Sequence, residues 1–355
     1  MSKKTNFSKK TPILVVFVII SLLIMSCGNK DGADTKGSST GGLGGGGLFG
    51  RSPDGPTTSS QDHYSGSEGI TVGFIENSPP DVVYDLEGTG GELLPLIQVQ
   101  NKGVFDATPI IYLSGFDPTI IKFRGSDLSG APLYDVITPA LRGKSTLNPE
   151  GEYRITELYG PADLNLGGDI DIYKTNLQLT TCYYYETKAS PVLCVDPDPF
   201  SPLTIRACEP KGWSGGGGQG APVSVTSVTQ QSMPGKISIV IEIANQGQGT
   251  ILEKSVVQSA INSPGRGGCL GNLKYNQVNR VYYAQGGDSG ISISGVTNLQ
   301  CEPTETVILG PDKKGRIFCQ GTVNSQTAYE APLRITLQYG YLQSWTTPIE
   351  IRSTS

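Results

Sequence analysis

One pattern occurs twice in this chain: Leu96-Ile97-Gln98-Val99-Gln100-Asn101-Lys102-Gly103 and, 144 residues further on, Val240-Ile241-Glu242-Ile243-Ala244-Asn245-Gln246-Gly247. Apolar and polar side chains alternate in both copies, which is typical of a strand with one buried face. Each copy then reaches Asn-x-Gly, which can end a strand because Asn and Gly tolerate positive φ and the Asn side chain bonds to nearby backbone. The repeat predicts two copies of one β module.

The same alternation recurs beyond residue 69, whereas we find no run with the apolar spacing of an amphipathic helix. Examples are Ile70/Val72/Phe74, Leu177/Leu179, Ile291/Ile293 and Leu333/Ile335/Leu337/Tyr339. Of the 355 residues, 47 are Gly and 24 are Pro, and many of these lie in turns between the strands. Many short strands with Gly/Pro turns predict antiparallel β-sandwiches.

A glycine-rich segment, Gly215-Gly216-Gly217-Gly218-Gln219-Gly220, separates the two copies. We therefore predict a linker at 211–220 between one β-sandwich domain at 69–210 and a second at 221–352, each of ordinary domain size. The alternative is two unrelated sandwiches that share a turn.

A strand that ends in Asn-x-Gly and is followed by small residues and another strand resembles the CARDB-like and other immunoglobulin-like modules of prokaryotic surface proteins. The resemblance covers the repeated stretch and the strand rhythm. It implies an all-β chain with two tandem antiparallel immunoglobulin-like domains. For function it implies spacer, adhesion or assembly roles without a shared catalytic site.

The N-terminus has the pattern of an export signal. Four lysines and no acid precede an apolar run from Pro12 to Met25, which is shorter than the roughly 20 residues that span a bilayer. The run ends at Met25-Ser26-Cys27-Gly28, which resembles the lipobox of prokaryotic lipoproteins. That resemblance implies a signal peptide at 1–26 and a lipid on Cys27 that anchors the protein on the extracytoplasmic side. The alternative is an uncleaved, short transmembrane anchor.

Residues 27–68 are rich in Gly and Ser and offer little to bury, so we predict a disordered tether after the lipidated Cys27. Without residues 1–26 the chain keeps 23 basic and 32 acidic residues, a net charge of −9. Nucleic-acid binding depends on Lys and Arg that neutralise phosphates, so we do not expect a nucleic-acid partner.

Six cysteines remain if Cys27 carries lipid: Cys182, Cys194, Cys208, Cys269, Cys301 and Cys319. An even number of cysteines in an exported chain predicts disulfides. The sequence contains no Cys-x-x-Cys pair, so a zinc site is not expected. Because three fall in each half, complete pairing requires a bridge across the predicted boundary. We predict the pairs Cys182–Cys194, Cys301–Cys319 and Cys208–Cys269. The alternative is free or metal-binding thiols.

The sequence argues against an enzyme. The only histidine, His63, lies in the predicted tether, so the predicted domains contain no imidazole base for a Ser-His-Asp or Cys-His site. The glycine runs lack the phosphate-binding motif GxxxxGK[ST]. A hydrolase with two carboxylates is the remaining enzyme class, and sequence cannot show their spacing.

One loop, from Asp163 to Asp171, has oxygen ligands at alternating positions and is the candidate calcium site, with Asp163, Asn165, Asp169 and Asp171 as ligands. It lacks the Glu of an EF-hand loop, since position 174 is Lys, and the simpler interpretation is a solvated turn. We interpret Asp196 and Asp198 as linker residues rather than ligands.

Clustered tyrosines, at 183–185, 282–283, 339 and 341, lie on strands and either contact a partner or fill a core. Taken together, the sequence predicts a non-enzymatic lipoprotein of the cell envelope without a cofactor. It would present two sandwiches to an envelope or surface protein, or to further copies of itself. The alternative function is a calcium- or glycan-binding surface module.

Overall fold

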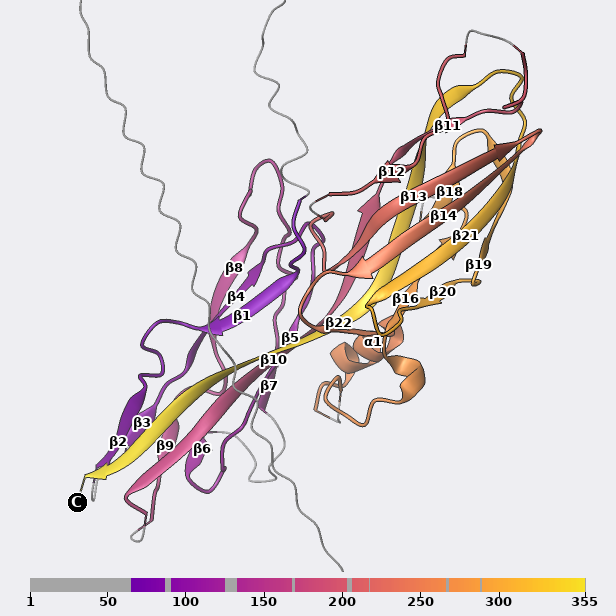
Figure 1. Ribbon diagram of the computed structural model, residues 1–355. Helices are drawn as coiled ribbons and strands as arrows, with labels where there is room; N and C mark the ends of the chain where they lie inside the picture. Colours follow the sequence, from indigo (N-terminus) through magenta and orange to yellow (C-terminus); the bar gives the residue numbers. More distant parts are fainter. Residues whose placement is uncertain are drawn as a thin grey trace, which may run out of the picture. The chain divides into compact units, whose positions relative to one another are not determined.

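The computed structural model describes residues 65–86, 91–124, 133–167, 170–202, 206–216, 218–265, 268–287 and 289–354. All of them lie in one compact unit, residues 58–355. The predicted signal peptide at 1–26, Cys27 and nearly all of the predicted tether lie outside the described residues. The regular secondary structure of the described residues is almost entirely β-strand, which confirms the predicted all-β sandwich fold (Figure 1).

The strands before residue 200 are β1 (Ile70–Phe74), β2 (Val82–Leu86), β3 (Gly91–Leu93), β4 (Leu96–Asn101), β5 (Ile110–Ser114), β6 (Ile121–Phe123), β7 (Leu133–Val136), β8 (Tyr153–Glu157), β9 (Ala162–Leu164), β10 (Ile172–Ala189) and β11 (Val192–Val195). The later strands are β12 (Trp213–Ser214), β13 (Val223–Met233), β14 (Lys236–Asn245), β15 (Thr250–Leu252), β16 (Arg280–Tyr282), β17 (Ala284–Gln285), β18 (Gly290–Ile293), β19 (Val296–Glu302), β20 (Thr306–Ile308), β21 (Lys314–Val323) and β22 (Tyr329–Thr354). Helix α1 spans Lys254–Asn262, and a short 3-10 helix, η2, spans Tyr275–Gln277.

Both repeated stretches form inner strands of their sheets. β4 lies at the centre of the sheet β1-β4-β8, and β14 lies inside the sheet β12-β13-β14-β21-β19. Apolar side chains of each, such as Ile97 and Ile241, are fully buried, as the alternation predicted. A larger sheet is organised around β22 and β10, and a small sheet has the order β3-β9-β6.

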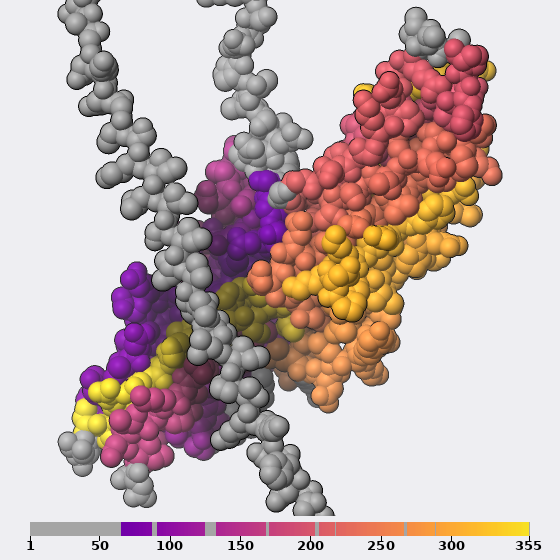
Figure 2. All heavy atoms as spheres, in the orientation of Figure 1, coloured from indigo at the N-terminus to yellow at the C-terminus, as the bar shows by residue number. Residues whose placement is uncertain are grey.

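The long strands β10 and β22 pair antiparallel over the whole length of β10, from Ile172 opposite Arg352 to Ala189 opposite Ile335. The C-terminal end of β22 also pairs, in parallel, with β2, whereas its N-terminal part pairs with β11 and β18. In Figure 2 the yellow C-terminal residues accordingly lie beside the indigo and magenta N-terminal ones at one end. Strands from both predicted domains therefore share one sheet.

This pairing corrects the predicted organisation: the segments 69–210 and 221–352 are not two separate sandwiches. The predicted linker at 211–220 is also not a free connection. The Gly220 N–H donates to Gly66 O at 2.9 Å, and the Gly220 carbonyl accepts from Val104 N–H at 2.9 Å. The two halves are modules of one fold that exchange strands.

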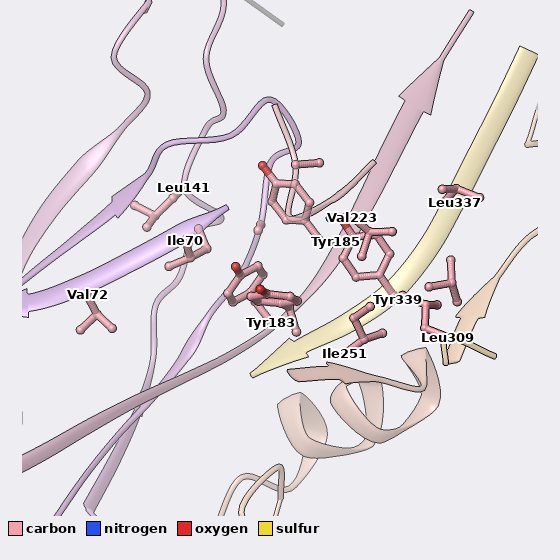
Figure 3. Packing of buried hydrophobic residues seen from close by; sticks show 14 of the residues in the cluster. Ile70, Val72, Leu141, Tyr183, Tyr185, Val223, Ile251, Leu309, Leu337 and Tyr339 are labelled. Carbon is pink, nitrogen blue, oxygen red and sulfur yellow. The ribbon is translucent and has the colours of Figure 1, made fainter. Parts of the chain in front are cut away.

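Four buried tyrosines mark the centre of the β10–β22 pair, and Figure 3 labels Tyr183, Tyr185 and Tyr339 among them. Tyr183 stands opposite Tyr341 and Tyr185 opposite Tyr339, and each is at most 1% exposed. Neighbouring ring centroids lie 5.6–6.5 Å apart. The sequence left open whether these tyrosines contact a partner or fill a core, and in the structure they fill a core. Because each strand contributes the same Tyr-x-Tyr, the pair has a local two-fold axis through Tyr184 and Gly340.

Each Asn-x-Gly end is bonded to one of these tyrosines. Asn245 Oδ1 accepts from Gly247 N at 3.2 Å and from the Tyr341 hydroxyl at 3.3 Å, and that hydroxyl accepts from Gly249 N at 2.7 Å. In the first module Asn101 Oδ1 accepts from Gly103 N at 3.1 Å and from the Tyr185 hydroxyl at 3.3 Å. The repeat seen in the sequence therefore corresponds to the same arrangement in both modules: the Asn side chain bonds to the backbone of its own loop and to a buried tyrosine hydroxyl.

Helix α1 packs against the outer face of the β10–β22 pair. No run with the apolar spacing of an amphipathic helix was found in the sequence, so this helix is a correction to that expectation. Val256, Val257 and Ala260 bury one side of the helix in a second apolar cluster with Cys182 and Cys269. Gly340 permits this approach, because a Cβ at that position would overlap the Val257 Cγ2 methyl.

Candidate functional site

The disulfides connect Cys182 to Cys269, Cys194 to Cys208 and Cys301 to Cys319. The predicted pair Cys301–Cys319 and the prediction of one bridge across the halves are confirmed, the latter by Cys182–Cys269. The predicted pairs Cys182–Cys194 and Cys208–Cys269 are wrong. Cys182 and Cys194 do not face each other across a hairpin, because both lie along the run that pairs in one register with β22. Twelve extended residues separate them by roughly 40 Å.

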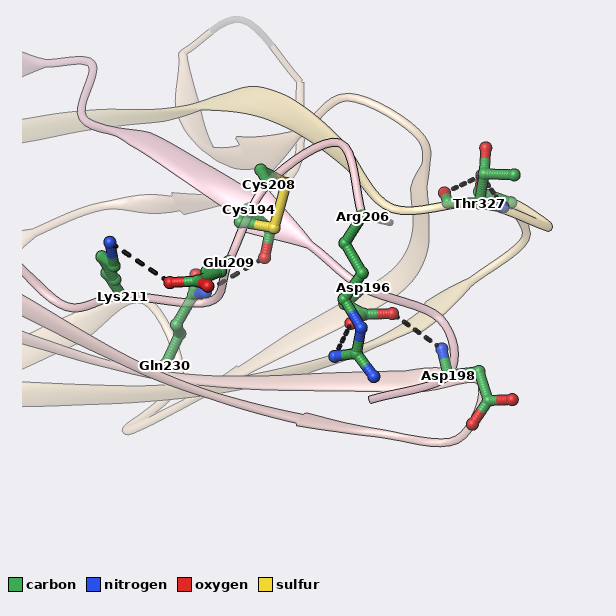
Figure 4. The surroundings of a disulfide bond; sticks show 10 residues. Cys194, Asp196, Asp198, Arg206, Cys208, Glu209, Lys211, Gln230 and Thr327 are labelled. Atoms are coloured by element: carbon green, nitrogen blue, oxygen red, sulfur yellow. Dashed lines mark hydrogen bonds and ion pairs between the residues drawn. A yellow bond between two sulfur atoms is a disulfide. The ribbon is translucent and has the colours of Figure 1, made fainter. Parts of the chain in front are cut away.

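Asp196 and Asp198 lie beside the Cys194–Cys208 bridge (Figure 4). Asp196 is 4% exposed, and its carboxylate accepts from the Arg206 guanidinium at 2.9 Å and from Asp198 N–H at 3.0 Å. This buried pair, together with the disulfide, fixes the chain after β11. The arrangement accords with the structural interpretation of these two residues.

The candidate calcium ligands have other partners. The Asp163 carboxylate accepts from Arg124 Nη2 at 2.8 Å, and this guanidinium lowers the pKa of Asp163. Asn165 Oδ1 accepts a hydrogen bond from Gly167 N–H within its own turn at 3.1 Å. The backbone carbonyl of Asp171 accepts one from Ser353 N–H. Asp169 lies outside the described residues. In the described ranges no group of three or more His, Cys, Asp or Glu side chains is arranged to hold a metal, and calcium binding stays a prediction.

A groove of about 810 Å³ lies beside the C-terminal half of β10. One wall is the chain from Glu186 to Pro191, and the other is β12 with the residues after it. Phe105 and Trp213 supply apolar surface, and the Phe105 ring contacts Tyr184 at 5.8 Å between centroids. We refer to this hollow as the edge groove.

The β10 wall of the edge groove is an unpaired strand edge. In an antiparallel pair, alternate residues direct their N–H and C=O toward the partner strand. Leu333 N–H donates to Pro191 O at 2.8 Å and Ser353 N–H to Asp171 O at 2.9 Å, so odd-numbered residues of β10 and the turn after it bond to β22. Even-numbered residues point away from β22, and β5 covers them only up to Cys182.

Glu186, Lys188 and Ser190 consequently direct backbone N–H and C=O groups into the groove. Among the described residues, none of these groups has a backbone partner. The facing strand β12 pairs with β13 on one side only. Unpaired strand edges therefore form both long walls of the groove.

Of the two charged side chains that line the groove, Glu186 is engaged in hydrogen bonds and Lys188 is exposed. The Glu186 carboxylate accepts from the Tyr184 hydroxyl at 2.6 Å and from Gln338 Nε2 at 3.0 Å. The Lys188 side chain is 71% exposed, and its Nζ lies 3.9 Å from Glu186 Oε2. The groove thus offers backbone hydrogen bonds, two aromatic surfaces and one accessible cation.

Sequence reasoning did not find this groove. Its two walls are more than 20 residues apart in the chain, and only the β10–β22 register shows which backbone groups face outward. The signal that was present is the pair Lys188 and Pro191, since Lys and Pro are common on exposed strand edges, where they discourage indiscriminate pairing.

Comparison with known proteins leaves the family open: no protein-family model matches this chain, and no curated protein matches it. Within the described residues, no helix has both the length and the apolar character needed to cross a bilayer.

Proposed function

We propose that this chain is a non-enzymatic lipoprotein of the prokaryotic cell envelope, anchored through Cys27, that binds an extended segment of a partner protein in the edge groove. The sequence pattern around Cys27 supports the anchor. The observation that carries the binding role is the row of unpaired backbone groups at Glu186, Lys188 and Ser190.

An extended polypeptide satisfies this row best. Addition of a strand supplies one backbone hydrogen bond for each outward N–H or C=O, and side chains of the added strand give specificity. At about 3.3 Å per residue, the edge from Glu186 to Ser190 pairs with a segment of about five residues. Lys188 favours a carboxylate in that segment, and Phe105 and Trp213 favour an apolar residue beside it.

Hydrogen exchange on the full chain tests the binding mode. The partner is first captured by a photo-crosslinker placed at Ser190 on intact cells, and its bound segment is then synthesised as a peptide. We expect the peptide to slow exchange of the backbone amides of Glu186, Lys188 and Ser190, while Thr187 and Ala189, which bond to β22, change little. Protection of another surface without these three amides would refute strand addition.

Charge reversal provides a second test. Lys188→Glu should weaken peptide binding, whereas Lys122→Glu, an exposed lysine on β6, should leave it unchanged. Equal loss in both variants would indicate a general charge effect instead of a contact in the groove.

The anchor is tested independently. Cys27→Ala should abolish lipid attachment and release the protein from the membrane fraction. Unchanged processing and membrane association of Cys27→Ala would contradict the lipoprotein assignment without affecting the groove.

A further inference from the structure

A lysine, a carboxamide and a carboxyl group lie together on the outer face of the β10–β22 pair, under helix α1. Lys254 Nζ donates to Gln338 Oε1 at 3.0 Å, and Gln338 Nε2 donates to Glu186 Oε1 at 3.0 Å. Glu186 and Gln338 are cross-strand neighbours in the register, and Lys254 is the first residue of α1. The Gln338 carboxamide therefore contacts the Lys254 amine through its oxygen and the Glu186 carboxyl group through its nitrogen.

The surroundings hold these three groups in place. The Tyr184 hydroxyl donates to Glu186 Oε1 at 2.6 Å, and Lys254 Nζ lies 3.2 Å from the centroid of the Tyr282 ring. Burial lowers the pKa of Lys254, although Glu186, Glu253 and Glu305 act in the opposite direction. A lysine shifted in this way has a larger neutral fraction, and only the neutral amine is a nucleophile.

We propose that Lys254 and Gln338 join in an intramolecular isopeptide bond, with Glu186 as the proton carrier. The Lys254 ammonium first gives a proton to the Glu186 carboxylate, which leaves a neutral amine and a neutral acid. The Nζ lone pair attacks Gln338 Cδ and forms the new C–N bond. Glu186 then protonates Nε2, the old C–N bond breaks, and ammonia leaves.

The proton balance closes within the site. The Glu186 carboxylate recovers a proton from Nζ as the new amide becomes neutral, and no electrons are transferred. The amine and the primary amide become a secondary amide and ammonia, so no further reactant is required. Proximity accounts for the reaction without a cofactor, because fixed neighbours react with high effective concentration.

The bond would connect α1 to β22 covalently, and the disulfide Cys182–Cys269 connects β10 to the segment that follows α1. The helix would then be tied to each of the two long strands, once through sulfur and once through an amide. In a protein held at a surface by one end, such bonds keep the exchanged strands together under tension.

Mass spectrometry of the full chain, purified from its native envelope and reduced, tests the proposal. We expect a tryptic species in which the peptide containing Lys254 is joined to the one containing Gln338, with a mass lower than their sum by one ammonia. Cleavage after Lys254 should be blocked. Recovery of both peptides separately, with their unmodified masses, would refute the proposal.

Three variants distinguish chemistry from proximity. Lys254→Arg removes the nucleophile but keeps a cation, and Glu186→Gln keeps both reacting side chains but removes the proton carrier. Both should give only separate peptides. Lys188→Arg, on the same strand as Glu186, should retain the joined species. A joined species in Glu186→Gln, with a native circular dichroism spectrum, would overturn the role of Glu186.

Discussion

The hydroxyl of Tyr341 provides the most direct test of how the two modules are joined. It is buried, accepts from Gly249 N–H at 2.7 Å and donates to Asn245 Oδ1 at 3.3 Å. Tyr341→Phe keeps the ring in the four-tyrosine cluster but leaves the partly buried Gly249 amide without an acceptor. A buried donor that loses its partner costs about 1–3 kcal/mol, and we expect a decrease of this size in the free energy of unfolding.

The symmetry-related variant, Tyr185→Phe, supplies the comparison. Its hydroxyl accepts from Phe105 N–H at the longer distance of 3.2 Å, so its loss should cost the same or slightly less. Because β10 and β22 share one register over both modules, each variant should shift one common unfolding transition. Tyr275→Phe, whose side chain is 86% exposed, is the control and should change stability by less than about 0.5 kcal/mol.

Equilibrium urea denaturation with the disulfides intact, followed by circular dichroism and by tyrosine fluorescence, measures these values. A common midpoint from both probes and unchanged m-values would support a single cooperative unit. Two transitions, with Tyr185→Phe moving only one and Tyr341→Phe only the other, would refute the reasoning that strand exchange couples the modules.

Three further perturbations test the same fold. Burial raises the pKa of Tyr341 to about 12 and that of Tyr183 well above its usual value. The contribution of these tyrosines to stability should therefore be constant below pH 10 and fall above it, by up to about 1.4 kcal/mol per pH unit for each. The part of the tyrosinate absorbance that comes from the buried tyrosines should rise only together with unfolding, after the part that comes from exposed tyrosines. Gly340→Ala should cost about 1–3 kcal/mol in urea denaturation because its Cβ overlaps Val257, whereas Gly73→Ala, with no atom near the added carbon, should cost less. Replacing both Cys182 and Cys269 by Ala opens a loop with a sequence separation of 87 and should lower the free energy of unfolding by roughly 4–5 kcal/mol. The same replacement of Cys301 and Cys319, whose separation is 18, should lower it by about 3 kcal/mol. Equal decreases for the two pairs would argue against the chain-entropy account.

Alternation was sufficient to predict the β fold and the repeated strands, because one face of β4 and of β14 is buried by the opposite layer. The Asn-x-Gly repeat indicated a shared turn but not its partner. The tyrosines that clamp Asn101 and Asn245 lie more than 80 residues further along the chain, and no local pattern connects them.

The course of β22 could not be predicted from local propensities, because its 26 residues include Pro332, Gly340 and Pro348. Both prolines stand opposite even-numbered residues, Val192 and Asn176, where β22 makes no bond through its N–H to that neighbour. Proline is tolerated in a strand where its nitrogen does not face a partner. Gly340, which normally weakens a strand, is placed where α1 needs space. Each apparent strand breaker therefore lies where the tertiary structure accepts it.

The missed helix and the missed groove have a common origin. Only nine residues long, α1 gains stability from packing on the β10–β22 pair more than from its own sequence. The edge groove likewise exists because β10 continues past the end of β5 to reach the second module, which leaves Glu186 to Ser190 covered by β22 on one side alone. Strand exchange thus has two consequences: it joins the modules into one unit, and it exposes the backbone edge at which we propose that a partner strand adds.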